Sequence, residues 1–152
     1  MVSLSDEVGR LFAPRHLKPP VDWVADNCVL RDNISELCGS LRMFAYAREP
    51  MNALVDPTVS KITLCWGSQS SKTTTMYAGM AYLLSEFPKD TLWIMPSAEN
   101  ARSFSKGRWL PFIEDCAPLR SQCPISVTTG RVDTDRITNM RQEFLNCTLT
   151  LA

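Results

Sequence analysis

One segment constrains the fold more than any other, because it joins an apolar run, a short polar stretch and a long run with helical spacing. Lys61–Trp66 is β-branched and apolar, which predicts a buried strand. Gly67–Ser71 is small and polar, which is typical of a loop. Lys72–Phe87 carries apolar residues at near-helical spacing and predicts a helix of about four turns.

A second strand and helix follow. Thr91–Met95 is another apolar run that predicts a buried strand. Ser97 is the expected N-cap of the next helix, with Glu99 in its first turn. This order predicts an α/β fold with a parallel sheet and flanking helices. Shorter strands are predicted at Ile125–Val127 and Asn146–Leu151, and because the second runs into the last residue we expect the fold to be incomplete at its C-terminus.

The segment before the loop divides into two parts. Residues 1–45 are polar and interrupted by prolines, and we interpret them as an irregular N-terminal arm that packs on a following domain, residues 46–152. Within the arm, a short helix is expected around Trp23, with Asp22 as a candidate N-cap. Arg48–Leu54 predicts a further helix.

Composition excludes several classes of protein. Lys+Arg and Asp+Glu are 16 each, so a polybasic nucleic-acid-binding chain is excluded. No run of eighteen apolar residues is present, so no membrane span is expected.

Six cysteines without C-x-x-C spacing and a lone His16 argue against a zinc site. The cysteines are expected to be reduced and buried, Cys65 above all. Three cations, Arg102, Lys106 and Arg108, are interpreted as an ordinary solvated face. The less favoured interpretation is a contact with DNA or with another subunit.

The loop has the chemistry of a phosphate site. Small residues let backbone N–H groups converge on phosphate oxygens, and the helix N-terminus adds a positive dipole. Lys72 stands where a lysine reaches the β- and γ-phosphates, and Thr73 where a hydroxyl ligates Mg²⁺. The strict pattern G-x-x-x-x-G-K-[ST] is not met, since Trp66 and Ser71 occupy the glycine positions. From the pattern alone, a phosphate-binding loop and a Ser/Thr-rich turn before a core helix both stay open.

The surrounding residues resemble the N-terminal part of the ATPase domain of phage terminase large subunits, in particular the lambda-type DNA-packaging family. The family's Pro-rich segment, its Tyr-Gln-Arg-Glu adenine-side motif, its Walker A region (often Ser-x-Gln-x-Gly-Lys-Thr) and the next strand are matched in order and spacing. The matching stretches here are Pro19–Asp26, Tyr46–Leu54, Ile62–Thr74 and Leu92–Ser97.

The resemblance implies a P-loop NTPase-type motor that uses ATP and Mg²⁺ to push double-stranded DNA into a capsid. It implies partners in a small terminase subunit and the capsid portal, a homo-oligomeric parent, a separate endonuclease domain and a place in the host cytoplasm. Lys72 and Thr73 are expected in the catalytic site, with Thr73 as the metal ligand. The residues expected to bind the nucleotide are Gly67, Ser68, Gln69, Ser70, Ser71, Lys72, Thr73, Thr74, Tyr46 and Arg48.

Several residues depart from that family pattern. Ala47 stands where an adenine-reading Gln is usual, and Ser71 where Gly is usual. A Walker B strand ending in Asp-Glu is expected only after Ala152, so hydrolysis by this chain stays an open question, and we expect the isolated chain not to turn over ATP. Two other interpretations stay open, a helicase-like P-loop ATPase and a non-catalytic remnant of a prophage gene.

Overall fold

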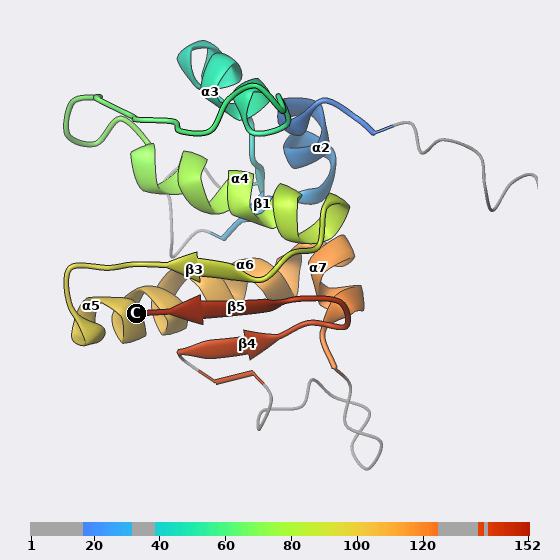
Figure 1. Ribbon diagram of the computed structural model, residues 1–152, viewed down its shortest axis with the longest axis vertical. Coiled ribbons are helices and arrows are strands. Elements are labelled where there is room, and N and C mark those ends of the chain that lie inside the picture. Colours follow the sequence, from blue (N-terminus) through green and yellow to red (C-terminus); the bar gives the residue numbers. More distant parts are fainter. Residues whose placement is uncertain (1–16, 32–38, 125–136, 139) are drawn as a thin grey trace, which may run out of the picture.

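A small mixed sheet and a set of helices make up the computed structural model, which describes residues 17–31, 39–124, 137–138 and 140–152 (Figure 1). The sheet has the order β3 (Thr91–Trp93), β5 (Thr148–Leu151), β4 (Arg141–Glu143). β3 and β5 are parallel, whereas β4 pairs with β5 in the antiparallel sense. β1 (Val29–Leu30) and β2 (Gly39–Ser40) form a separate antiparallel pair. The predicted α/β class is thus confirmed, whereas the sheet is mixed and not wholly parallel as predicted, because β4 runs antiparallel to β5.

The predicted helices are present. Ser97 caps its helix as expected, because its Oγ accepts a hydrogen bond of 3.2 Å from the backbone N–H of Asn100. Asp22 is not an N-cap: it lies inside its helix, because Pro20 at the first helical position starts that helix after Pro19. The bounds are α2 Pro20–Asn27, the 3₁₀ turn η1 Ala45–Ala47, α3 Arg48–Ala53, α4 Lys72–Glu86, α5 Ala98–Phe104, the π-helical turn η2 Ser105–Trp109, α6 Leu110–Asp115 and α7 Ala117–Gln122.

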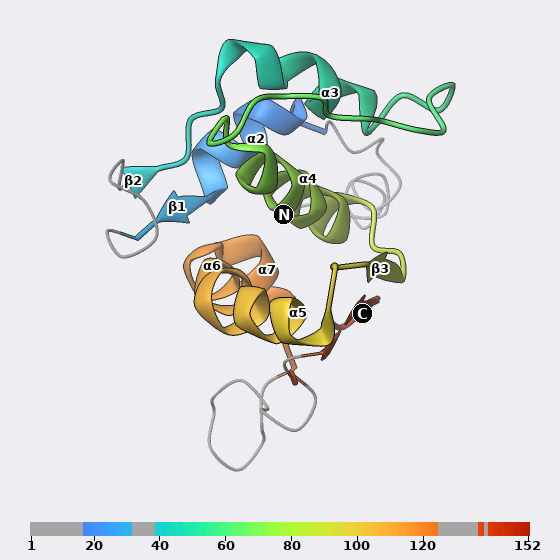
Figure 2. The ribbon, with the colours of Figure 1, turned by 90° about the vertical axis from the view of Figure 1, so that its left-hand side faces the viewer.

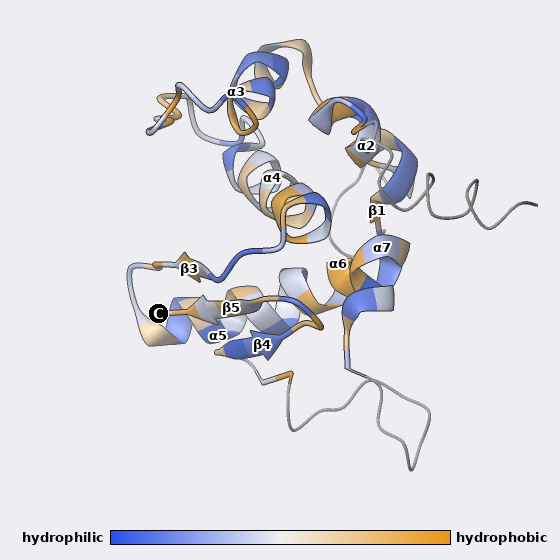
Figure 3. Cartoon of the chain, turned by 45° about the vertical axis from the view of Figure 1, so that its right-hand side comes forward, coloured by the Kyte–Doolittle hydropathy of each residue, from blue (hydrophilic) through white to orange (hydrophobic). Residues whose placement is uncertain are grey.

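Helices α5 and α6 cover one face of the three-stranded sheet (Figures 1 and 2). Leu149 and Leu151 of β5 are fully buried beneath them. Trp93 of β3 packs on Phe104 of α5, with ring centroids 4.7 Å apart. On the opposite face Leu92 is 59% exposed, beside its register partner Thr150. β5 therefore has the half-buried alternation predicted from its sequence, and Figure 3 shows it next to the hydrophilic β4.

A buried polar cluster joins β4 to the π-helical turn. Gln142 is fully buried; its side-chain oxygen accepts a hydrogen bond from Trp109 Nε1, and its nitrogen donates to Ser105 Oγ at 3.1 Å. Each partner is therefore satisfied away from water, as a buried amide requires.

The N-terminal helix α2 packs on α4. The rings of Trp23 and Tyr82 meet edge to face, with centroids 5.5 Å apart. Trp23 Nε1 also donates to Glu86 Oε1 at 2.9 Å. Aromatic packing and a directed hydrogen bond together fix α2 along the back of α4, which leaves the N-terminal end of α4 for the loop.

The predicted strand at Lys61–Trp66 is wrong, because this segment is irregular and has no strand partner among the described residues. Cys65, expected in the core, is exposed. An apolar run becomes a strand only where a neighbour satisfies its backbone groups, and within the described ranges β3 pairs only with β5. The strand predicted at Ile125–Val127 lies outside the described residues, as does His16. No helix in the described part of the chain is long and apolar enough to span a membrane.

Candidate functional site

Two residues of the loop before α4 have left-handed backbone angles. Gln69 has φ 55° and Ser71 has φ 57°, a region that non-glycine residues rarely occupy. Ser71 is the N-cap of the fifteen-residue α4, yet no side chain caps the helix. Within the described hydrogen bonds the backbone N–H groups of 72–74 donate to no carbonyl, and the first bond of the helix runs from Thr75 N–H to the oxygen of Ser71. The end of α4 therefore presents unused donors and the positive end of its dipole.

Lys72 folds back over this loop. Its Nζ donates to the carbonyl oxygen of Trp66 at 2.7 Å and also to that of Gly67. Ser70 Oγ donates to the same Gly67 carbonyl at 2.6 Å. The ammonium group thus lies among the groups of the loop, with backbone carbonyls as its acceptors.

The three threonines after Lys72 have different surroundings. Thr73 is half-buried at the rim of a hollow beside α4. Thr74 does not line the hollow; it neighbours Tyr77, whose pKa is raised by burial and lowered in part by Thr74. Thr75 is buried, and its hydroxyl oxygen has no partner among the described residues. Of the three, Thr73 is the one that is half-buried and also lines the hollow, so its hydroxyl is the best placed for an outside ligand.

Tyr46 lies against the loop. Its hydroxyl donates to the carbonyl oxygen of Ser70 at 3.2 Å. Its ring stacks on Phe44 at a centroid distance of 5.4 Å and meets Trp66 edge to face at 4.9 Å. We refer to Phe44, Tyr46 and Trp66 as the aromatic ladder. Of these three aromatic residues, the sequence predicts only Tyr46 in the nucleotide site; an aromatic residue two positions before it is the signal that indicates Phe44.

Two other residues of the adenine-side motif behave differently. Arg48 is exposed at the start of α3, and no hydrogen bond in the described structure joins it to the loop. Ala47 is 1% exposed, so the position expected to read the base is turned into the core. Tyr46 is exposed and its hydroxyl reaches the loop, whereas the neighbouring Ala47 is buried.

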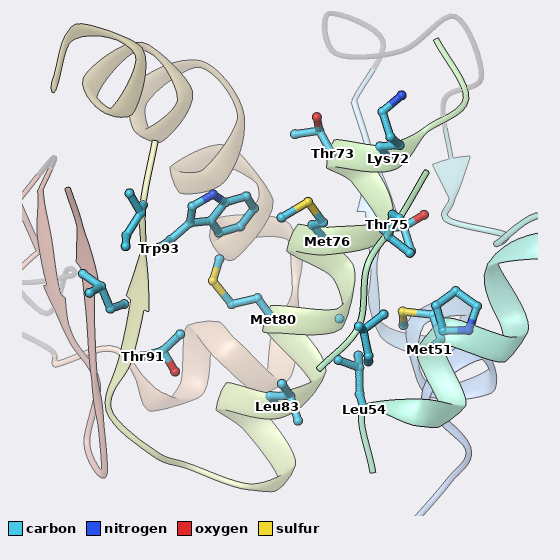
Figure 4. Close-up of a pocket in the computed structure, with 16 residues that line it drawn as sticks. Met51, Leu54, Lys72, Thr73, Thr75, Met76, Met80, Leu83, Thr91 and Trp93 are labelled. Atoms are coloured by element: carbon cyan, nitrogen blue, oxygen red, sulfur yellow. The ribbon is translucent and has the colours of Figure 1, made fainter. Parts of the chain in front are cut away.

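A hollow of about 580 Å³ opens beside the loop (Figure 4). Lys72 and Thr73 lie at one end of it, and Met76, Met80 and Leu83 follow along α4. The far wall is β3 with its neighbour Ile94, which is 73% exposed. This apolar lining suits hydrocarbon surface, so a charged phosphate fits the hollow only at its Lys72 end.

The described residues contain no group of three or more His, Cys, Asp or Glu side chains that could hold a metal ion. Asp133 and Asp135 lie outside those residues. The three cations Arg102, Lys106 and Arg108 are exposed and make no ion pair with another described residue. Four of the five described cysteines are buried as expected: Cys28, Cys116, Cys123 and Cys147.

The mixed α/β fold, with its small sheet and flanking helices, is consistent with an ATPase domain. The match to known families makes this specific: the chain belongs to the family of the phage terminase large subunit gpA, ATPase domain, whose model matches residues 36–148. Comparison with curated proteins and with solved structures gave no significant match. Family membership supports a role in phage DNA packaging and the use of a nucleotide.

Proposed function

We propose that this chain binds ATP with Mg²⁺ through residues 67–74 and serves the ATP-driven motor of phage DNA packaging. In this proposal the domain is a P-loop NTPase and the loop is its Walker A region. The observation that carries it is the uncapped N-terminus of α4, preceded by a loop with two left-handed residues, in a chain of the terminase ATPase family. Alternating backbone angles of this kind turn successive N–H groups toward one point, where an anion is favoured.

The residues present fit a triphosphate and its metal. Backbone N–H groups from Ser68 to Ser71 and the first turn of α4 supply neutral donors, and Lys72 supplies a positive charge. The carbonyl bonds of Lys72 then exchange for phosphate bonds, which are stronger because both partners are charged. Thr73 would hold Mg²⁺, which neutralises charge on the phosphates when bound. Gly67, Gln69 and Ser70 shape the loop around them.

Calorimetric titration of the chain with MgATP and MgADP tests this function. Replacing Lys72 with Ala removes the positive charge, and we expect at least a tenfold loss of affinity. Lys89→Ala is the matched control, because Lys89 is exposed beyond the other end of α4. Absence of nucleotide binding by the unaltered chain, or equal binding by the two variants, would contradict the proposal.

The wider assembly follows from the family. Double-stranded DNA, a small terminase subunit, the capsid portal and further copies of the chain are the partners we propose, in the host cytoplasm. We propose endonuclease activity for the family's whole large subunit, and we assign it to none of the residues described here. Titration of the chain with a DNA duplex at low and high salt tests the proposed DNA binding. An absent signal, or an affinity that does not depend on salt, counts against it.

A further inference from the structure

The aromatic ladder leaves planar surface exposed beside the phosphate loop. Phe44 is 48% exposed and Tyr46 is 47% exposed, although the two rings are stacked within 7° of parallel. Aromatic rings are more often buried, and stacked rings in water are a surface that a planar apolar ligand can cover. Tyr46 has two ring partners and Phe44 only one among the described residues, so Phe44 is the ring that keeps a free face.

The aromatic ladder lies beside the loop and is joined to it by hydrogen bonds. Tyr46 reaches the Ser70 carbonyl through its hydroxyl, and Ser70 in turn bonds Gly67. Trp66 directly precedes the loop, and its backbone carbonyl accepts a hydrogen bond from Lys72 Nζ. A ligand whose phosphates lie on the loop would therefore place its remaining part near these rings.

The chemistry around the rings favours stacking and offers little reading of base edges. Ala47 is buried and has no polar side chain, and η1 carries no other side-chain donor or acceptor besides the Tyr46 hydroxyl, which Ser70 already occupies. Every nucleobase has a π face, and stacking on an aromatic residue therefore tolerates different bases. Discrimination between adenine and guanine needs hydrogen bonds to their edges.

We propose that Phe44 stacks on the nucleobase of the bound nucleoside triphosphate and that this site accepts adenine and guanine almost equally. The inference rests on the proposed function, since the phosphates must first lie on the loop. Base–aromatic stacking corresponds to about tenfold in affinity, so Phe44→Ala weakens ATP and GTP about tenfold each. Inorganic tripolyphosphate, which has no base, binds the variant and the unaltered chain alike.

The experiment is a titration of the full chain with MgATP, MgGTP and magnesium tripolyphosphate. Phe44→Trp is expected to keep the nucleotide affinity, and Phe87→Ala is the matched control, because Phe87 is 37% exposed at the far end of α4. A Phe44→Ala variant that binds ATP as well as the unaltered chain overturns the stacking role, while a Lys72-dependent tripolyphosphate signal still supports the loop. A preference for ATP over GTP of more than about tenfold overturns the tolerance for bases. If none of the three ligands binds, the proposed function fails and this inference fails with it.

Discussion

Replacing Ser71 with Gly tests the shape of the loop without any ligand. Ser71 holds φ 57° and ψ 23°, where a side chain with a Cβ costs about 1–2 kcal/mol. Glycine avoids this cost but loses about 0.5–1 kcal/mol more backbone entropy on folding. Alanine at 71 keeps the steric cost, and the serine hydroxyl makes no capping bond to lose. We therefore expect Ser71→Gly to be more stable than Ser71→Ala by about 0.5–1 kcal/mol.

Thermal and urea unfolding of the two variants measures that difference, which amounts to about 1–4 °C in Tm for a chain of this size. Ser103 in the exposed part of α5 gives the matched control. There the order reverses, and glycine is less stable than alanine by about 1 kcal/mol. If the alanine variant at position 71 is as stable as the glycine variant, Ser71 is not left-handed and the cradle of N–H groups described above does not form.

Further expectations follow from burial. Leu149→Ala, in the fully buried part of β5, is expected to cost about 2–5 kcal/mol by urea unfolding. Trp109→Phe leaves the buried Gln142 oxygen without its donor and costs about 1–3 kcal/mol in the same assay. Among the described thiols Cys65 is exposed and should react first with Ellman's reagent in the folded chain. Burial raises the pKa of Cys123 from 9.0 to about 11, so the thiol stays protonated to a higher pH in the folded state than in the unfolded state. The free energy of unfolding therefore falls as pH rises from about 9 to about 11. In Cys123→Ala this fall is expected to be shallower.

The helices could be predicted from sequence because their signals are local. Pro50 and Ser97 mark helix starts through backbone restriction or capping, and each lies in the first turn or at the cap of a helix in the structure, whereas α2 begins at Pro20 and not after the predicted cap Asp22. The apolar spacing of Lys72–Glu86 likewise needs only a buried side, which α2 and α7 supply.

The strands were less predictable because they depend on partners far away in the chain. Lys61–Trp66 and Thr91–Met95 have similar apolar content, yet only the second contains a strand, since β5 lies beside it. The direction of β4 also depends on its pairing with β5, which no local pattern specifies. The same reasoning applies to the aromatic ladder, because Phe44 and Trp66 meet through Tyr46 across a loop.

The departure of the loop from the usual glycine pattern has a physical interpretation. Glycine is favoured before the lysine of a phosphate loop because that position needs a left-handed backbone. Ser71 adopts φ 57° despite its side chain, and Gln69 adopts φ 55° two residues earlier. Ser71 thus adopts the left-handed conformation that glycine adopts more readily, at a cost in strain. It follows that the match to the strict pattern reports the cost of the loop conformation, whereas the phosphate binding that we propose depends on the conformation itself and on Lys72.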